Sequence, residues 1–252
     1  MEIAEFNKNN RINFLDTLRG ISMIYVVLYH FLYDIILFGV DVPFFDSFFM
    51  EAVHNFFLVI LITVSGICTA FSRNIFKRGA FIYILGGIIT FATSVFMPEN
   101  IVVFGVLSFF GISMLAYGTI KPLLDKIPWL WQFFIWFFLS VVFWSFDENG
   151  IINLFLVKFK LPDFLYEIKY LYPLGIKSDD FYSADYFSLI PWFFVFLCGT
   201  ALSKPVLEKK APELFYKISF KPIDFLGRNS LTVYIIHQPV IYGIVWLIFN
   251  VI

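Results

Sequence analysis

The stretch FLDTLRGISMIYVVLYHFLYDIILF, residues 14–38, is long and apolar enough to cross a bilayer, yet it holds four ionisable side chains. They are Asp16, Arg19, His30 and Asp34. At about 100° and about 1.5 Å per residue, all four fall on one stripe of a helix that extends over roughly 27 Å. An ionisable group that faces lipid costs several kcal/mol, so the stripe must face protein or a water-filled path. We therefore predict that this helix forms the wall of a functional site.

The composition is that of a membrane protein along the whole chain. Of the 252 residues, 60% are hydrophobic and 15% are charged, and the mean hydropathy is +0.83. Ordinary soluble domains are about half apolar and about a quarter charged, so that class is excluded. We expect an all-α, polytopic bundle of about seven membrane-spanning helices. The expected spans are residues 14–37, 54–72, 80–97, 101–120, 129–146, 186–203 and 229–251.

The loops between these spans differ in charge, and the difference predicts an orientation. Lysine and arginine collect before the first span, after the second and fourth spans, and between the last two. The opposite loops are acidic, with four lysines among them. Because positive residues favour the cytoplasmic side, we expect a cytoplasmic N-terminus and a C-terminus outside. We also expect a multi-pass protein of the plasma (inner) membrane, in contact with membrane lipid.

The chain offers no room for a separate soluble domain. The longest stretch outside the expected spans, residues 147–185, is still rich in Phe, Leu and Tyr, so we expect one transmembrane domain over residues 1–252. That stretch is predicted to be an outer loop with a possible re-entrant or interfacial helix, either as a plain cover or as a substrate lid. Cys68 and Cys198 lie inside expected spans, where we interpret them as packing residues. Neither a metal site nor a nucleic-acid partner is expected.

All three histidines fall within or at the edge of expected spans, where histidine is costly. Asp34 follows His30 by one helical turn, so its carboxylate can accept the ring N–H and leave the other nitrogen as a general base. The alternative is a structural pair that anchors the first span. His54 and His237 are each open to either interpretation, a site or a structural role.

Arg19 and Arg228 are the candidate anion binders, because guanidinium groups match phosphate geometry. Asn229 and Ser230 follow Arg228 at the start of the last span. A buried ion pair with Asp16 is the alternative for Arg19, and a simple topology signal is the alternative for Arg228. The layout permits transfer across the membrane along a hydrated path, from an anionic donor such as an acyl-CoA to an acceptor outside.

Several strings in this order resemble the membrane-bound acyltransferases, particularly the bacterial DUF1624 group related to heparan-α-glucosaminide N-acetyltransferase. The resemblance runs nearly end to end. It is carried by Leu18-Arg19-Gly20, His30-Phe31-Leu32-Tyr33-Asp34, Phe104-Gly105-Val106-Leu107, Pro191-Trp192-Phe193, Phe225-Leu226-Gly227-Arg228-Asn229-Ser230 and His237-Gln238-Pro239.

The resemblance implies an integral membrane acetyltransferase that uses cytoplasmic acetyl-CoA as the acyl donor. The acceptor is implied to be an amine or hydroxyl of a sugar or glycan on the far side; in the lysosomal relatives it is the amine of a terminal glucosamine. The expected catalytic residues are His30, Asp34 and His54. The expected coenzyme-binding residues are Arg19, Arg228, Asn229, Ser230 and His237.

The sequence departs from the family pattern at the catalytic histidine. In the alignment on Arg19-Gly20, His30 stands where the lysosomal enzymes have an asparagine, and residues 41–51, where their histidine falls, contain none. Either His30 or His54 takes over the role, or the chain has lost it. We favour His30, because it matches the histidine common in the first span of bacterial acyltransferases in the wider group.

Three other functions remain open from the sequence. One is a transporter or flippase for a lipid-linked saccharide, although no internal repeat supports it. The second is an enzyme that acylates hydroxyls on cell-surface polysaccharide, and the third is an inactive family member with a structural role. The identity of the acceptor, an acyl-histidine intermediate against direct transfer, and a homo-oligomeric state are left open as well.

Overall fold

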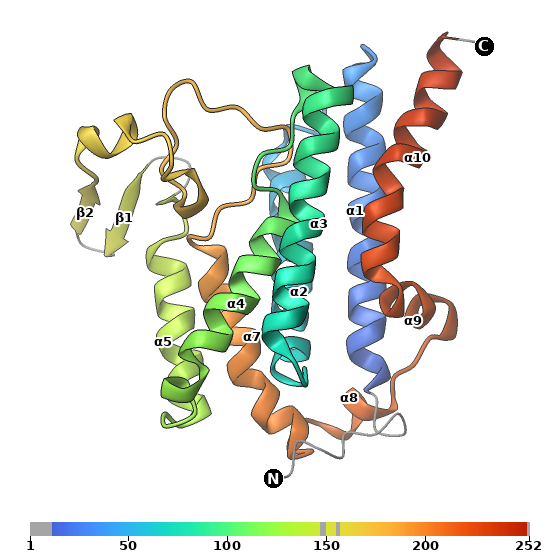
Figure 1. The fold of residues 1–252 in the computed structure, drawn as a ribbon. Helices are drawn as coiled ribbons and strands as arrows, with labels where there is room; N and C mark the ends of the chain where they lie inside the picture. Colours follow the sequence, from blue (N-terminus) through green and yellow to red (C-terminus); the bar gives the residue numbers. More distant parts are fainter. Residues whose placement is uncertain (1–11, 147–149, 155–156, 251–252) are drawn as a thin grey trace. The chain divides into compact units, whose positions relative to one another are not determined.

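A computed structural model describes residues 12–146, 150–154 and 157–250, and these are mostly helical (Figure 1). Five helices are long and apolar enough to cross a membrane, which confirms the prediction of a multi-pass helical protein. Two of the seven expected spans form shorter apolar helices, so the count of seven stays a prediction. The five are α1 (Asn13–Leu37), α2 (Phe48–Ala70), α3 (Ile75–Phe96), α4 (Val106–Leu124) and α10 (Ser230–Asn250); the two shorter ones are α5 (Trp129–Val142) and α7 (Trp192–Leu207).

Two helices begin several residues earlier than the hydropathy pattern predicts, because polar residues cap them. The hydroxyl of Ser47 accepts the amide of Met50 at 3.2 Å, one turn into α2. The side chain of Asn74 accepts the amide of Lys77 at 2.9 Å at the start of α3. Such caps satisfy backbone donors that the first turn of a helix leaves unpaired. The helices can therefore extend beyond their apolar stretch.

The chain divides into two compact units, which are described separately. The first comprises Met1–Val64 with Glu208–Ile252, and the second is Ser65–Leu207; α2 runs from one into the other. The expectation of one transmembrane domain stays a prediction.

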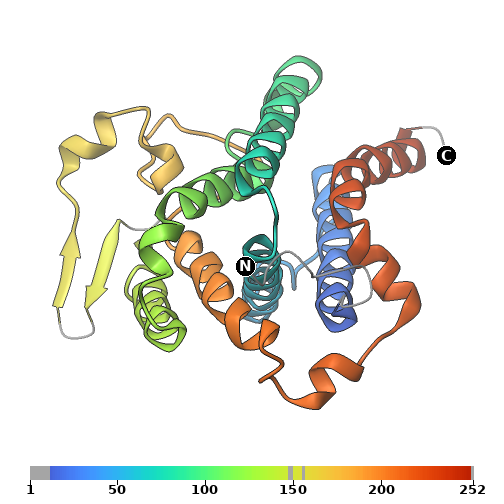
Figure 2. The same cartoon turned by 60° about the horizontal axis from the view of Figure 1, so that its bottom comes forward.

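In the first unit, the C-terminal segment of the chain packs along α1. The short helices α8 (Glu213–Lys217) and α9 (Lys221–Arg228) lie against its first half, and α10 runs beside it (Figures 1 and 2).

Two glycines bring α1 and α9 into backbone contact. A Cβ atom on Gly20 would lie 2.1 Å from the carbonyl oxygen of Ile223, and one on Gly227 would lie 1.8 Å from that of Asp16. Each glycine is thus required by close approach, and together they fix the arginines beside them.

In the second unit, α3 packs against α4 and α5 packs against α7. In the predicted outer loop, residues 147–185, the apolar piece does not form the possible interfacial helix. Its apolar piece forms an antiparallel hairpin of β1 (Ile151–Leu154) and β2 (Val157–Lys160), followed by the short 3-10 helices η4 (Asp163–Glu167) and η5 (Tyr172–Leu174). The alternation of apolar and charged residues over Val157–Lys160 has the period of a strand, which a reading of overall hydropathy overlooks.

Candidate functional site

The four ionisable residues of α1 form two separate clusters, both of which face the C-terminal helices. Arg19 and His30 are eleven residues apart, which is about 16 Å along the helix. We call the first group, Asp16, Arg19 and Arg228, the arginine cluster. We call the second group the histidine cluster; it contains Tyr25, Tyr29, His30, Asp34, His54, His237 and Gln238.

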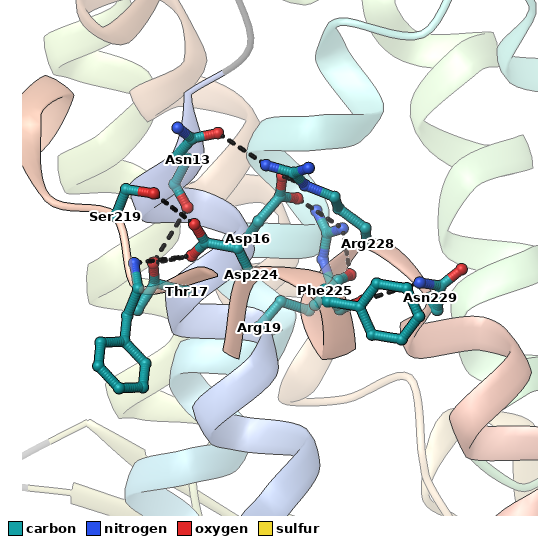
Figure 3. Close-up of polar contacts among 11 residues, drawn as sticks. Asn13, Asp16, Thr17, Arg19, Ser219, Asp224, Phe225, Arg228 and Asn229 are labelled. Carbon is teal, nitrogen blue, oxygen red and sulfur yellow. Dashed lines mark hydrogen bonds and ion pairs between the residues drawn. The ribbon is translucent and has the colours of Figure 1, made fainter. Parts of the chain in front are cut away.

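The arginine cluster is built around a buried carboxylate between two guanidinium groups (Figure 3). Asp16 is 3% exposed; its Oδ1 lies 3.6 Å from Nη1 of Arg19, and its Oδ2 lies 3.4 Å from Nε of Arg228. Arg19 also donates to the carbonyl of Gly227 at 3.1 Å, and Arg228 donates to Oδ1 of Asn13 at 3.1 Å. The ion pair that the sequence offered as the alternative for Arg19 is therefore present. The structure also brings Arg19 and Arg228 together, as the predicted anion site requires.

The two arginines differ in how far solvent can reach them. The side chain of Arg228 is 44% exposed, whereas that of Arg19 is 14% exposed and is held by two oxygen partners. Asn229 and Ser230 follow directly, where α9 ends and α10 begins. The side-chain Nδ2 of Asn229 donates to the carbonyl of Phe225 at 2.8 Å. Arg228 is thus the guanidinium that can gain a further anionic partner without leaving its position.

A second buried carboxylate, Asp224, secures α9 beside this cluster (Figure 3). It accepts hydrogen bonds from the hydroxyl of Thr17, from the hydroxyl of Ser219 at 2.6 Å and from the amide of Phe220 at 3.3 Å. Burial raises the pKa of Asp224, but these hydrogen bonds and the charge of Arg228 outweigh it, so its pKa lies below the ordinary value. Asp224 therefore stays ionised and links α9 to α1.

Thr17 and Asp224 are not among the site residues predicted from the sequence. One signal was available, because Asp224 and Arg228 are four residues apart on a short amphipathic helix, where such pairs are neighbours. The partner on α1 lies about two hundred positions earlier in the chain and left no local signal.

The three histidines of the chain, which come from three helices, lie in one row. The ring of His30 meets that of His237 edge-on, with centroids 4.8 Å apart. Tyr29 lies between His30, at 5.9 Å, and His54, at 4.2 Å. The hydroxyl of Tyr25 is 3.3 Å from Nδ1 of His54. The structure thus gathers every imidazole of this protein in one place, as a site for proton transfer requires.

Hydrogen bonds to backbone carbonyls indicate which nitrogen carries a proton in two of the rings. Nδ1 of His30 donates to the carbonyl of Val26 at 2.9 Å, and Nδ1 of His237 donates to the carbonyl of Tyr234 at 2.5 Å. A carbonyl oxygen can only accept, so Nδ1 carries the proton in each ring. In a neutral ring, Nε2 then holds the lone pair. A neutral His30 with this hydrogen bond is in the tautomer that a general base acting through Nε2 needs.

The predicted hydrogen bond between His30 and Asp34 is not formed, and this interpretation is corrected. Helical side chains lean toward the N-terminus, so the ring of His30 turns back to Val26 and away from Asp34. Asp34 accepts the side-chain amide of Gln238 instead, at 2.8 Å. Gln238 was matched only as part of a string, and its partner could not be predicted from local spacing.

His237 lies with the histidine cluster, although it was predicted to bind the coenzyme along with the arginines. Arg19, Arg228, Asn229 and Ser230 lie at or directly beside the arginine cluster. Within residues 12–146, 150–154 and 157–250, no group of three or more His, Cys, Asp or Glu side chains is arranged to hold a metal ion.

The sequence matches the family model described as heparan-alpha-glucosaminide N-acetyltransferase, catalytic, over residues 11–239. The match spans most of the chain and includes both clusters. No curated protein and no solved structure matched the chain.

Proposed function

The chain belongs to the heparan-α-glucosaminide N-acetyltransferase catalytic family, and from that membership we propose how it works as a membrane acetyltransferase. It transfers an acetyl group from cytoplasmic acetyl-CoA to an amine or hydroxyl of a sugar or glycan on the opposite side of the membrane. The histidine cluster is the catalytic centre and the arginine cluster is the donor site. Seven spans, a cytoplasmic N-terminus and a place in the plasma membrane are part of this proposal.

The arrangement of His30 supports the proposal more than any other observation. Its Nδ1–H is held by the carbonyl of Val26, and its ring meets His237 edge-on in a row of imidazoles. A general base has to present a lone pair from a fixed position, and a proton that is held on Nδ1 meets that condition at Nε2. His54 is the second candidate base, since it is joined to the same row through Tyr29.

The donor site follows from the exposed guanidinium of Arg228. A pyrophosphate or 3′-phosphate that docks there gains a charge-assisted hydrogen bond, while Asp16 and Arg19 keep the guanidinium in place. The pantetheine arm then extends along α1 for the roughly 16 Å that separate Arg19 from His30. In this proposal, the distance between the two clusters matches the distance between the phosphates and the thioester of the bound coenzyme.

The transfer needs one base, placed beside the acceptor atom that attacks the acyl carbon. Nε2 of His30 takes the proton of the acceptor N–H or O–H while that atom attacks the thioester carbonyl. The C–S bond breaks, and the thiolate receives the proton from the imidazolium. In the second route Nε2 attacks the thioester first, the C–S bond breaks, and CoA leaves as a thiolate that takes a proton from water. The acceptor then attacks the acyl-imidazole, the bond between the acyl carbon and Nε2 breaks, and the acceptor's proton passes to the freed Nε2 and on to water, which gives ping-pong kinetics. In both routes positioning contributes much of the rate, because thioesters are reactive.

Sealed proteoliposomes test this proposal directly. The protein is reconstituted, labelled acetyl-CoA is supplied on the face that exposes the N-terminus, and glucosamine is supplied on the other face. Labelled N-acetylglucosamine in the second compartment, dependent on protein, is the expected result. Movement of a lipid-linked saccharide without any acetylated product would instead favour the transporter, and acetyl transfer that occurs only with both substrates on one side would overturn the proposed direction.

A further inference from the structure

Among the described residues of the first unit, three buried carboxylates lie on or against α1, and two of them have compensating partners. Asp16 faces two guanidinium groups, from Arg19 and Arg228. Asp224 accepts three hydrogen bonds, which come from two hydroxyls and one backbone amide. Both carboxylates therefore have the partners that a buried negative charge requires.

Asp34 is buried more completely and has far fewer partners. It is 0% exposed, and among the described residues it accepts a single hydrogen bond, from Nε2 of Gln238 at 2.8 Å. Its other oxygen, Oδ2, is buried and has no hydrogen-bond partner among the described residues. The same holds for Oε1 of Gln238. Two adjacent groups thus share one hydrogen bond, and each keeps an unsatisfied acceptor.

Among the described residues, no lysine or arginine forms an ion pair with Asp34. The titratable side chains beside the pair are His30, one turn earlier on α1, and His237, next to Gln238 on α10. Both rings donate their Nδ1–H to carbonyls of their own helices. An ionised carboxylate in a membrane-spanning helix would here remain largely unpaired, at a cost of several kcal/mol.

We propose that Asp34 is held in its protonated form and joins Gln238 in an uncharged acid–amide pair. In this pair the O–H on Oδ2 of Asp34 donates to Oε1 of Gln238, while Nε2 of Gln238 donates to Oδ1 of Asp34. One proton supplies the donor that both unsatisfied oxygens lack. The pair connects α1 to α10 without placing a charge inside the membrane.

The pair gives Gln238 a positioning role, a step that rests on the proposed function. His237 precedes Gln238 and packs against His30, so the acid–amide pair of Asp34 and Gln238 holds the two rings together. Asp34 then acts through its shape and hydrogen bonds, and no negative charge on it is required for catalysis.

Infrared difference spectroscopy tests the protonation state without any assay of activity. The C=O stretch of a protonated carboxyl group lies above the amide I band and is separate from carboxylate bands. The wild-type spectrum minus that of Asp34→Asn should show this protonated band at neutral pH, and the band should shift in Gln238→Leu because its hydrogen-bond partner is lost. A difference spectrum with only carboxylate bands would overturn the proposal, whatever the activity.

Kinetics of matched variants test the positioning role. Asn mimics protonated Asp, since its amide group can both donate to and accept from Gln238, whereas Leu can do neither. Asp34→Asn should retain kcat within about threefold, and Asp34→Leu and Gln238→Leu should each lower kcat by at least tenfold with KM for acetyl-CoA nearly unchanged. If Asp34→Asn loses as much activity as Asp34→Leu, the carboxylate charge matters and the proposal fails. If Asp34→Asn instead raises KM for the sugar acceptor alone, the carboxyl oxygens of Asp34 bind substrate, and the acid–amide pair is likewise refuted. An inactive wild type would contradict the proposed function but leave the infrared result decisive for the pair.

Discussion

Replacing Gly227 by alanine should separate α9 from α1. An alanine Cβ at this position would lie 1.8 Å from the carbonyl oxygen of Asp16, whereas ordinary contact begins at 3.4 Å. The backbone atom cannot rotate away, so α9 must move back by about 1.6 Å. That shift lengthens the contact between Arg228 and Asp16 from 3.4 Å to about 5 Å, and it removes the hydroxyl of Thr17 from Asp224.

The expected loss of stability combines two effects. Overpacking costs about 1–3 kcal/mol. A buried carboxylate that loses one hydrogen bond adds about 1–3 kcal/mol. A total of about 2–6 kcal/mol, at roughly 2–4 °C per kcal/mol for a chain of this size, lowers Tm by about 4–24 °C.

Thermal unfolding in nanodiscs, followed by intrinsic fluorescence, measures this change. Gly243→Ala in α10 is the matched control, because a Cβ atom there meets nothing within 4 Å. The control should leave Tm unchanged or raise it, since alanine favours a helix by up to about 1 kcal/mol over glycine. If Gly227→Ala is as stable as Gly243→Ala, close approach of α1 and α9 is refuted.

Two further predictions concern the groups on α9. The pKa of Asp224 lies below its ordinary value of 3.8, so Asp224 stabilises the fold above that pH and its contribution is lost as the pH falls through the lower, folded pKa. Asp224→Asn should therefore be less stable than wild type at neutral pH in chemical denaturation, and the gap should close in acid; a constant gap down to the acid transition would contradict this. Arg228→Gln should raise KM for acetyl-CoA about fivefold, roughly 1 kcal/mol for an exposed charge, with kcat unchanged and a weaker dependence on salt than wild type. An unchanged KM would remove Arg228 from the donor site.

Sequence patterns predict a candidate site on α1, because ionisable residues are costly in a membrane-spanning helix and therefore indicate a special environment. Asp16, Arg19, His30 and Asp34 share a helical stripe, and in the structure the stripe faces α9 and α10, as the cost of charges in lipid requires. The close approach at Gly20 could not be predicted, because a glycine in a helix has many explanations and its neighbour on α9 is about two hundred residues away.

The hydrogen-bond partners of these side chains could not be predicted from sequence spacing alone. The residues at positions 30 and 34 are one turn apart, which suggested that they form a pair, but ring direction and a distant amide decided otherwise. The outer hairpin was missed for a similar reason, since a short apolar segment fits a helix or a strand until its alternation is counted. The hydrated path between the first and last helices stays a prediction.

The proposed mechanism depends most on His30 as the catalytic base, and the variant His30→Asn tests this role directly. Asn retains a side-chain amide that can donate to the carbonyl of Val26 but has no equivalent of Nε2. His54→Asn is the matched control within the same row of rings. In single-turnover acetyl transfer with saturating acetyl-CoA, His30→Asn should lower the rate by about 10²–10⁴-fold and leave acetyl-CoA binding intact, while His54→Asn retains most of the rate. A full rate in His30→Asn, or a large loss in His54→Asn alone, would contradict the account.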